Sequence, residues 1–291
     1  MIQYGKQDII QDDIDAVAKV LKSDFLTQGP CIPKFEQEVS KYCGAKHAVA
    51  VTSSTSALHL ACLSLGLGKD DWLWTSPVTF VASANCGVYC GAKVDFVDID
   101  PDTYNLCPKA LKNKLVQAKD LGKLPKVVVP VHLCGQPCDM KAIYALSEEY
   151  GFKLIEDASH AIGGKYLNEP IGNCKYSDIT VFSFHPVKII TTGEGGISLT
   201  NNSKLAERMS LLRSHGITRD SNQMDHKPDG GWYYQQIELG FNYRMTDIQA
   251  ALGISQMQRL DMYVASRHAL ATRYHELLKE FPVVTPYQNN D

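Results

Sequence analysis

Short runs of apolar and β-branched residues alternate along the chain with segments whose apolar residues recur every three or four positions. The first pattern is typical of strands and the second of helices. It predicts seven strands, at 48–52, 72–76, 94–99, 127–132, 154–157, 179–184 and 195–200. It predicts helices at 12–22, 33–42, 57–65, 79–90, 108–118 and 139–150, and a long helical pattern over 245–281.

The regular alternation of strands and helices indicates the fold class. Strands joined through helices run parallel, and their apolar character on both faces requires helices above and below the sheet. We therefore expect a three-layer α/β/α protein with a mostly parallel, seven-stranded sheet.

Composition narrows the possible partners. The 291 residues are 44% hydrophobic and carry a formal net charge of −3, with both signs interspersed. Such a chain has no basic footprint for nucleic acid or an anionic membrane surface, so a small-molecule substrate is expected. The first residues show no cationic stretch followed by an apolar core, and no run of eighteen apolar residues occurs, which favours a cytoplasmic protein.

The nine cysteines show no framework spacing, and their odd number suggests free thiols. Zinc can be imagined at Cys86 with Cys90, or at His132 with Cys134 and Cys138. A structural zinc site needs four ligands, and neither place offers an obvious fourth. We therefore expect no metal.

A single lysine, Lys188, lies between the last two predicted strands, enclosed by Phe184, Pro186, Val187, Ile189 and Ile190. Desolvation lowers the pKa of an amine, and a neutral amine attacks carbonyl groups, so a Schiff-base lysine fits this setting. The alternative is a lysine whose stem crosses apolar neighbours while its head stays in water.

The hydroxyl-rich segment 53–56 joins a predicted strand to a predicted helix. Main-chain N–H groups and the helix dipole converge there, which suits a phosphate group. The alternative is an ordinary Ser or Thr helix cap.

Several such features follow the carboxyl ends of predicted strands, where ligands gather in parallel sheets. Beside the phosphate site and Lys188 are an aromatic ring, Phe80, and the polar pair Asp157 and His160. Phe80 can stack on a flat ring, and Asp157 can hold a pyridine nitrogen protonated, although a carboxylate there can also cap the next turn. Together these features match the needs of pyridoxal 5′-phosphate.

The motifs at 52–58, 77–80, 156–161, 183–188, 193–196 and 240–245 occur in the order found in DegT-type sugar aminotransferases, which the chain resembles from about residue 4 to its end. The resemblance implies the aspartate-aminotransferase-like fold (fold type I). It also implies a large cofactor-binding domain with an N-terminal arm at 1–250. Residues 251–291 would then begin a smaller C-terminal domain, of which this chain has only the start.

The resemblance also implies the site. It gives Lys188 as the catalytic residue. The implied cofactor-binding residues are Ser54, Thr55, Ser56, Phe80, Asp157, His160, Ser183, Lys188 and Asn242. The implied substrate-binding residues are Tyr4, Asp24, Phe25, Leu26, Thr27, Ser54, Ser183 and Asn242.

Within the family the chain most resembles the transaminases of pseudaminic acid biosynthesis. These use L-glutamate to aminate the 4-keto carbon of a UDP-linked 6-deoxy-N-acetylhexose. Asn242 would reach the active site of a neighbouring subunit, which implies a homodimer. The alternatives are another nucleotide-linked keto sugar as substrate, or a cofactor-binding regulatory protein without turnover. A related deoxysugar dehydratase is disfavoured, because those enzymes carry histidine at the position of Lys188.

Overall fold

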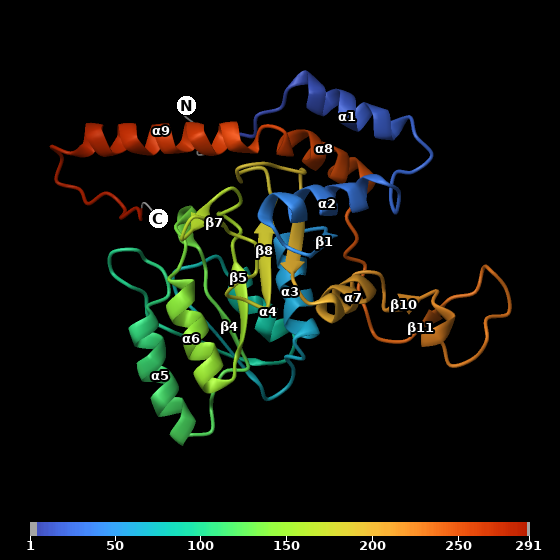
Figure 1. Cartoon of the computed structure of the whole chain (residues 1–291), viewed down its shortest axis with the longest axis horizontal. Coiled ribbons are helices and arrows are strands. Elements are labelled where there is room, and N and C mark those ends of the chain that lie inside the picture. Colours follow the sequence, from blue (N-terminus) through green and yellow to red (C-terminus); the bar gives the residue numbers. More distant parts are fainter. Residues whose placement is uncertain (1–4, 290–291) are drawn as a thin grey trace.

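The computed structural model describes residues 5–289, which build a central seven-stranded sheet covered by helices (Figure 1). Across the sheet the strand order is β1-β9-β8-β5-β4-β2-β3. β9 pairs antiparallel with both of its neighbours, β1 and β8, and the other four strand pairs of the sheet are parallel, so the expected mostly parallel arrangement is confirmed. The strands are β1 (His47–Val51), β2 (Trp72–Thr75), β3 (Lys93–Phe96), β4 (Val127–Val129), β5 (Lys153–Asp157), β8 (Ile179–Ser183) and β9 (Gly196–Thr200).

Helices cover both faces of this sheet, as the three-layer expectation requires. The helices are α1 (Gln11–Leu21), α2 (Cys31–Cys43), α3 (Ser54–Ser64), α4 (Ala82–Tyr89), α5 (Pro108–Asp120), α6 (Met140–Tyr150), α7 (Ser203–Leu212), α8 (Asp247–Met257) and α9 (Leu260–Leu278). Two short 3₁₀ turns, η1 (Leu133–Gly135) and η2 (Ser221–Gln223), complete the helical elements of the described residues.

Alternation along β4 shows how the two faces are filled. Val127 and Val129 pack with apolar residues of α3, α4 and α7, whereas Val128 between them packs with residues of α5 and α6. A third cluster joins α2 and α8 to β8 and β9, with Phe35 and Phe182 fully buried in it. Successive side chains of a strand point to opposite faces, so an unbroken apolar run fills both layers.

The helical pattern over 245–281 forms two helices, where the sequence suggested one long pattern. α8 ends at Met257 and α9 begins at Leu260, and Arg259 between them has φ −113° and ψ 5°. The Arg259 guanidinium donates a 2.6 Å hydrogen bond to the buried Asp13 carboxylate, and this contact holds the chain at the break. No glycine or proline marks the position, so the sequence pattern did not reveal it.

Two predicted helices begin three residues away from the expected position. α3 begins at Ser54 instead of residue 57, because the Ser53 side chain caps the helix by accepting from Ser56 N. α4 begins at Ala82 instead of residue 79, since the preceding residues form a loop.

Small elements outside the main sheet were not predicted. The helix α7 was missed, as were two hairpins (Figure 1). The first hairpin turns at Leu167 and Asn168, both with positive φ, a conformation that only asparagine of the two favours. The hairpin strands are β6 (Lys165–Tyr166) with β7 (Glu169–Pro170), and β10 (Ile217–Thr218) with β11 (Gln235–Gln236).

Across residues 5–289, none of the helices is both long and apolar enough to cross a membrane. All nine cysteines are free thiols, as expected from their spacing.

Candidate active site

The polar residues singled out in the sequence gather where the parallel strands end. Asp157 is the last residue of β5, Ser183 is the last residue of β8, and these two strands pair side by side. Lys188 lies in the connection from β8 to β9. The carboxyl edge of a parallel sheet is the usual place for ligands, so this edge is the candidate active site.

Asp157 is buried, and both oxygens of its carboxylate are held. The Ser83 hydroxyl donates a 2.6 Å hydrogen bond to Oδ2. The hydroxyl and the main-chain N–H of Ser159 donate to Oδ1 at 2.6 and 3.2 Å. Three donors fix the orientation of a negative charge that has little contact with solvent.

Lys188 sits half-buried in a loop with its own hydrogen bonds. Its N–H donates to the His185 carbonyl at 2.9 Å, and the Thr191 hydroxyl donates to the Phe184 carbonyl at 2.9 Å. Burial lowers the pKa of the Lys188 amine, although the charges of Asp157 and Cys134 act in the opposite direction. Among the described residues the amine has no hydrogen bond or ion pair, so it is available to react.

His160 is the third titratable group of the cluster. The Cys134 N–H donates a 3.2 Å hydrogen bond to Nδ1 of His160, which makes this nitrogen the acceptor. Burial and the charge of Lys188 lower the pKa of His160, while Asp157 opposes the change. The charge of Asp157 acts on both Lys188 and His160, and the charge of Lys188 acts on His160, so the three groups lie near one another. The sequence motifs suggested this proximity.

The start of α3 has both a helix cap and free donors for a phosphate, which the sequence offered as alternatives. Ser53 acts as the helix cap, and the Ser56 hydroxyl is buried against the hydroxyls of Thr52 and Ser53 at 3.1 and 3.0 Å. The hydroxyls of Ser54 and Thr55 are half-exposed and have no hydrogen-bond partner within residues 5–289. A helix start with unpaired N–H and O–H donors is suited to a phosphate.

β9 begins directly against this helix start. A Cβ added at Gly196 would lie 2.4 Å from the Ser54 nitrogen and from the Ser53 carbonyl carbon. Only a glycine permits this approach, and it keeps the start of α3 at the sheet edge near Ser183, which pairs with Gly196.

Phe80 and the segment 24–27 lie at the surface. The Phe80 ring is 72% exposed in the loop after β2, where one of its faces can receive a flat ligand. The segment 24–27 is held by α8, since Asp247 N–H donates to the Leu26 carbonyl at 3.0 Å and Thr27 pairs with Thr246. Tyr4 lies outside the described residues.

Asn242 is exposed in the segment that leads into α8. Its main chain pairs with Ser214, and the next residue, Tyr243, accepts a 2.9 Å hydrogen bond from Thr52 N–H. The Asn242 segment therefore runs beside the start of α3 in the same subunit.

Two residues near the site escaped the sequence reasoning. Ser83 follows Thr79 by four positions, and their hydroxyls share a 2.8 Å hydrogen bond, but nothing in the sequence marks Ser83 as the partner of a carboxylate 74 residues away. Cys134 was considered only as a metal ligand, yet its N–H orients His160.

The residues once considered for zinc have other partners. His132 Nε2 lies 2.8 Å from the Glu156 carboxylate, and its Nδ1 accepts from Cys138 N–H at 3.1 Å. Across the described range 5–289, no three His, Cys, Asp or Glu side chains are placed to hold a metal ion.

Comparison with known proteins agrees with this geometry. The DegT/DnrJ/EryC1/StrS aminotransferase family matches residues 7–291. A UDP-4-amino-4,6-dideoxy-N-acetyl-beta-L-altrosamine transaminase of Campylobacter jejuni subsp. jejuni serotype O:23/36 (strain 81-176) is 42% identical over 282 residues, which are 97% of this chain and 70% of the relative.

Solved structures agree in fold. Helicobacter pylori PseC, an aminotransferase involved in the biosynthesis of pseudoaminic acid, superposes with a TM-score of 0.85 at 31% identity, over 96% of this chain and 71% of that protein. A Streptococcus pneumoniae protein assigned as a sugar aminotransferase, in its PLP-form, gives 0.84 at 26% identity, over 96% and 72%. The chain therefore belongs to the DegT/DnrJ/EryC1/StrS aminotransferase family, and it is an aminotransferase that uses pyridoxal 5′-phosphate.

Proposed function

We propose that this aminotransferase moves the amino group of L-glutamate to the 4-keto carbon of a UDP-linked 4-keto-6-deoxy-N-acetylhexose, in pseudaminic acid biosynthesis. The observation that carries the aminotransferase chemistry is the cluster of Lys188, Asp157 and His160 at the carboxyl edge of the sheet. The substrate is inferred from the named Campylobacter jejuni relative and from PseC.

Lys188 is proposed to attach to the cofactor and then to act as the general base and acid. When bound, pyridoxal phosphate supplies an electron sink for the carbon that loses its proton. With the cofactor bound, the Lys188 amine would take up the proton that leaves the α-carbon of the amino donor and return it on the cofactor side. Burial that lowers the pKa of Lys188 increases the share of the neutral amine, the form that attacks a carbonyl and accepts a proton.

Asp157 is proposed to keep the pyridine nitrogen of the cofactor protonated. Its carboxylate is buried and held by Ser83 and Ser159, so its charge stays in one place. A fixed negative charge favours a proton on a neighbouring nitrogen, and a protonated ring withdraws electrons more strongly. Nδ1 of His160 accepts from Cys134 N–H, so Nε2 is the nitrogen of His160 that is proposed to face the cofactor beside Asp157.

The start of α3 is proposed to bind the cofactor phosphate. Ser54 and Thr55 supply unpaired hydroxyls, Ser56 supports the turn, and Ser183 lies on the neighbouring strand end. The exposed Phe80 ring would cover one face of the cofactor.

The sugar nucleotide is proposed to contact the segment 24–27, Tyr4 and Ser54. The segment 24–27 offers the exposed side chains of Asp24, Phe25 and Leu26, while its main chain is fixed to α8. An exposed but anchored segment can bind a ligand at little entropic cost. Ser183 and Asn242 complete the proposed substrate contacts.

We also propose a homodimer in which Asn242 serves the neighbouring active site. Supporting this, the arm formed by β10, β11 and their loop projects from the body of the protein (Figure 1). It exposes large aromatic side chains. Trp232 is 72% exposed and Tyr234 is 52% exposed. Side chains of this size usually mark an interface, and a second copy is the partner that the family resemblance implies.

The nine free thiols suit a reducing compartment, so we propose the cytoplasm.

The test is a two-step assay with the purified protein and pyridoxal phosphate. First, L-glutamate alone should change the absorbance of the bound cofactor and release one equivalent of 2-oxoglutarate per site. The UDP-linked 4-keto-6-deoxy-N-acetylhexose should then restore the original spectrum and gain one amine, detected by mass spectrometry. If a UDP-linked 4-keto pentose works and the hexose does not, the substrate proposal is wrong. If no amino donor changes the absorbance spectrum of the bound cofactor, the protein is better described as a cofactor-binding protein without turnover.

A further inference from the structure

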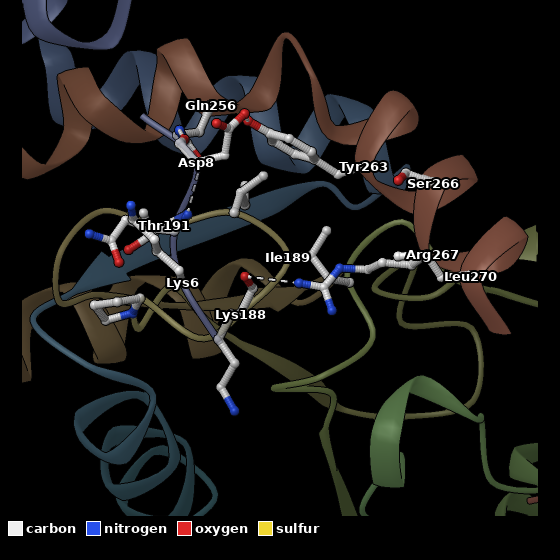
Figure 2. A pocket seen from close by; sticks show the side chains of 13 residues that line it. Lys6, Asp8, Lys188, Ile189, Thr191, Gln256, Tyr263, Ser266, Arg267 and Leu270 are labelled. Atoms are coloured by element: carbon white, nitrogen blue, oxygen red, sulfur yellow. Dashed lines mark hydrogen bonds between the residues drawn. The ribbon is translucent and has the colours of Figure 1, made fainter. Parts of the chain in front are cut away.

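A cleft of about 330 Å³ lies behind the Lys188 loop, between the residues that precede α1 and the helices α8 and α9 (Figure 2). Lys6 and Asp8 line one side, Tyr263 and Arg267 line another, and Lys188 itself contributes to the wall. The Arg267 guanidinium reaches from α9 to the Lys188 carbonyl at 3.5 Å (Figure 2). The cleft is therefore the place where the N-terminal segment, the C-terminal helices and the reactive loop meet.

Gln256 of α8 connects these parts from inside the cleft. Its side chain is only 2% exposed. Its Nε2 donates to the Asp8 carbonyl at 2.9 Å and to Oδ2 of Asp13 at 2.9 Å. Its Oε1 accepts from the main-chain N–H of Thr191 at 3.4 Å. One buried amide thus joins the start of the chain to the loop that carries Lys188.

The partners of Gln256 are themselves held firmly. Asp13 is fully buried and also accepts from the Ile10 N–H at 3.1 Å and from Arg259 at 2.6 Å. On the exposed side, the Tyr263 hydroxyl donates to Oδ2 of Asp8 at 2.9 Å. Burial alone would raise the pKa of Asp13, but the nearby Ser255 hydroxyl and the hydrogen bonds from Ile10, Arg259 and Gln256 hold it below its usual value. The carboxylate therefore stays charged and keeps Nε2 of Gln256 directed toward it.

Thr191 carries this connection to the reactive lysine. The hydroxyl of Thr191 donates to the Phe184 carbonyl and accepts from Gly193 N–H, both at 2.9 Å, so these bonds close the loop around Lys188. The Gln256 contact is made at the Thr191 N–H, three residues from Lys188. Movement of the N-terminal segment would therefore be transmitted to the main chain of the loop.

We infer that Gln256 is a positioning residue for Lys188, which couples the placement of residues 6–10 to the placement of the lysine amine. The inference rests on the proposed function, in which Lys188 carries the proton and the residues next to this segment contact the sugar nucleotide. Two donor hydrogens, for Asp8 and Asp13, and an acceptor for Thr191 must be present in one side chain. A neutral amide supplies two donors and an acceptor, whereas a hydroxyl or a neutral imidazole has only one donor hydrogen.

The test replaces Gln256 with methionine, which keeps the length and volume but removes both hydrogen-bonding functions. The matched control is Gln258→Met, because Gln258 is exposed two positions along the chain. We expect Gln256→Met to lower kcat about tenfold to hundredfold, as small misplacements of reacting groups do, with little change in KM for L-glutamate. The pH at which the absorbance of the lysine-bound cofactor changes should also shift, whereas Gln258→Met should match the unaltered protein.

A second readout needs no cofactor. Amide hydrogen exchange of the protein without added pyridoxal phosphate should become faster in both 6–10 and 186–193 in Gln256→Met, and in neither segment in Gln258→Met. Faster exchange in only one of the two segments, or an unchanged kcat and pH profile, would overturn the inference.

A further variant covers the case in which Gln256→Met fails to fold. Tyr263→Phe removes only a hydroxyl at the exposed end of the network, and it should speed exchange at 6–10 and, more weakly, at 186–193. Unchanged exchange at 186–193 would then count against coupling. If Lys188→Ala were active, the proposed function itself would fail, which is a result distinct from any of these.

Discussion

The hydroxyl of Ser83 donates a 2.6 Å hydrogen bond to Oδ2 of Asp157, across 74 positions of the sequence. Ser83 lies in the first turn of α4, after β2, and Asp157 ends β5, with β4 between these strands in the sheet. The orientation of the carboxylate is therefore set by a helix that is remote in the chain. This contact makes α4 part of the active site.

We expect Ser83→Ala to lower kcat/KM by about tenfold to hundredfold, since a hydrogen bond to a charged group contributes about 1.5–3 kcal/mol. The measurement is steady-state transamination with L-glutamate. Ser64→Ala is the matched control, because the Ser64 hydroxyl is equally buried but has no hydrogen-bond partner within residues 5–289. Equal effects of the two substitutions would show that Ser83 matters only for packing.

We expect Lys188→Ala to reduce turnover by about 10³-fold or more, because the variant lacks the amine that would hold the cofactor and move the proton. The bound cofactor should also lose the absorbance typical of its lysine-attached form. Lys175→Ala should leave both properties unchanged, since Lys175 pairs with Glu169 at the surface, 2.6 Å away. Turnover close to that of the unaltered protein would remove the basis of the proposed mechanism.

The sequence was sufficient for the main sheet and for the reactive cluster. Val127 to Val129 form a continuous apolar run, which only a strand covered on both faces can bury, and the structure confirms it. Asp157 ends such a strand and Lys188 lies in the connection after another, and these positions marked both residues. The carboxyl ends of parallel strands meet at one edge, so local pattern implied spatial proximity.

The sequence was insufficient where a tertiary contact decides the local structure. The break between α8 and α9 depends on Arg259 reaching the buried Asp13, a partner 246 positions away. Ser83 has the same character, because its role is defined only by Asp157. The spacing of apolar residues indicates which face of a helix or strand is buried, but it does not indicate which polar side chains contact one another.

The buried pair of His132 and Glu156 predicts a pH dependence of stability. Burial by itself lowers the pKa of His132, but hydrogen bonds with Cys138 and Glu156 outweigh it and raise the pKa to about 10. The ordinary value of 6.5 applies to the unfolded chain. The contribution of His132 is therefore fully present below pH 6.5 and is lost as the pH rises through about 10. Urea unfolding followed at several pH values should show this loss.

Replacing His132 identifies the source of that dependence. His132→Gln should lower the free energy of unfolding by about 1.5–3 kcal/mol, because it removes the ring that donates to the buried Glu156 carboxylate and accepts from Cys138 N–H. The alkaline decline should then become shallower. His268→Gln, at an exposed position of α9, should change neither quantity. An unchanged alkaline decline in His132→Gln would assign it to other groups.

The proposed role of Asn242 in the neighbouring subunit predicts complementation. Lys188→Ala and Asn242→Ala should each be weakly active alone. After unfolding and refolding together they should recover about a quarter of the unaltered activity, because half of random dimers are mixed and each mixed dimer has one intact site. Light scattering should give twice the mass of the chain. A mixture no more active than the sum of its parts would place Asn242 in the active site of its own subunit.

Gly196 should be sensitive to the smallest side chain. Its added Cβ would lie 2.4 Å from Ser54 N, so Gly196→Ala must push β9 away from the start of α3. We expect a loss of about 1–3 kcal/mol in the free energy of unfolding, typical of overpacking, and weaker binding of pyridoxal phosphate. Gly68→Ala is the control, because a Cβ there meets nothing within 4 Å. If Gly196→Ala lost stability but bound the cofactor with unchanged affinity, the start of α3 would not be the phosphate site, since its N–H and O–H donors could not move without weakening that contact.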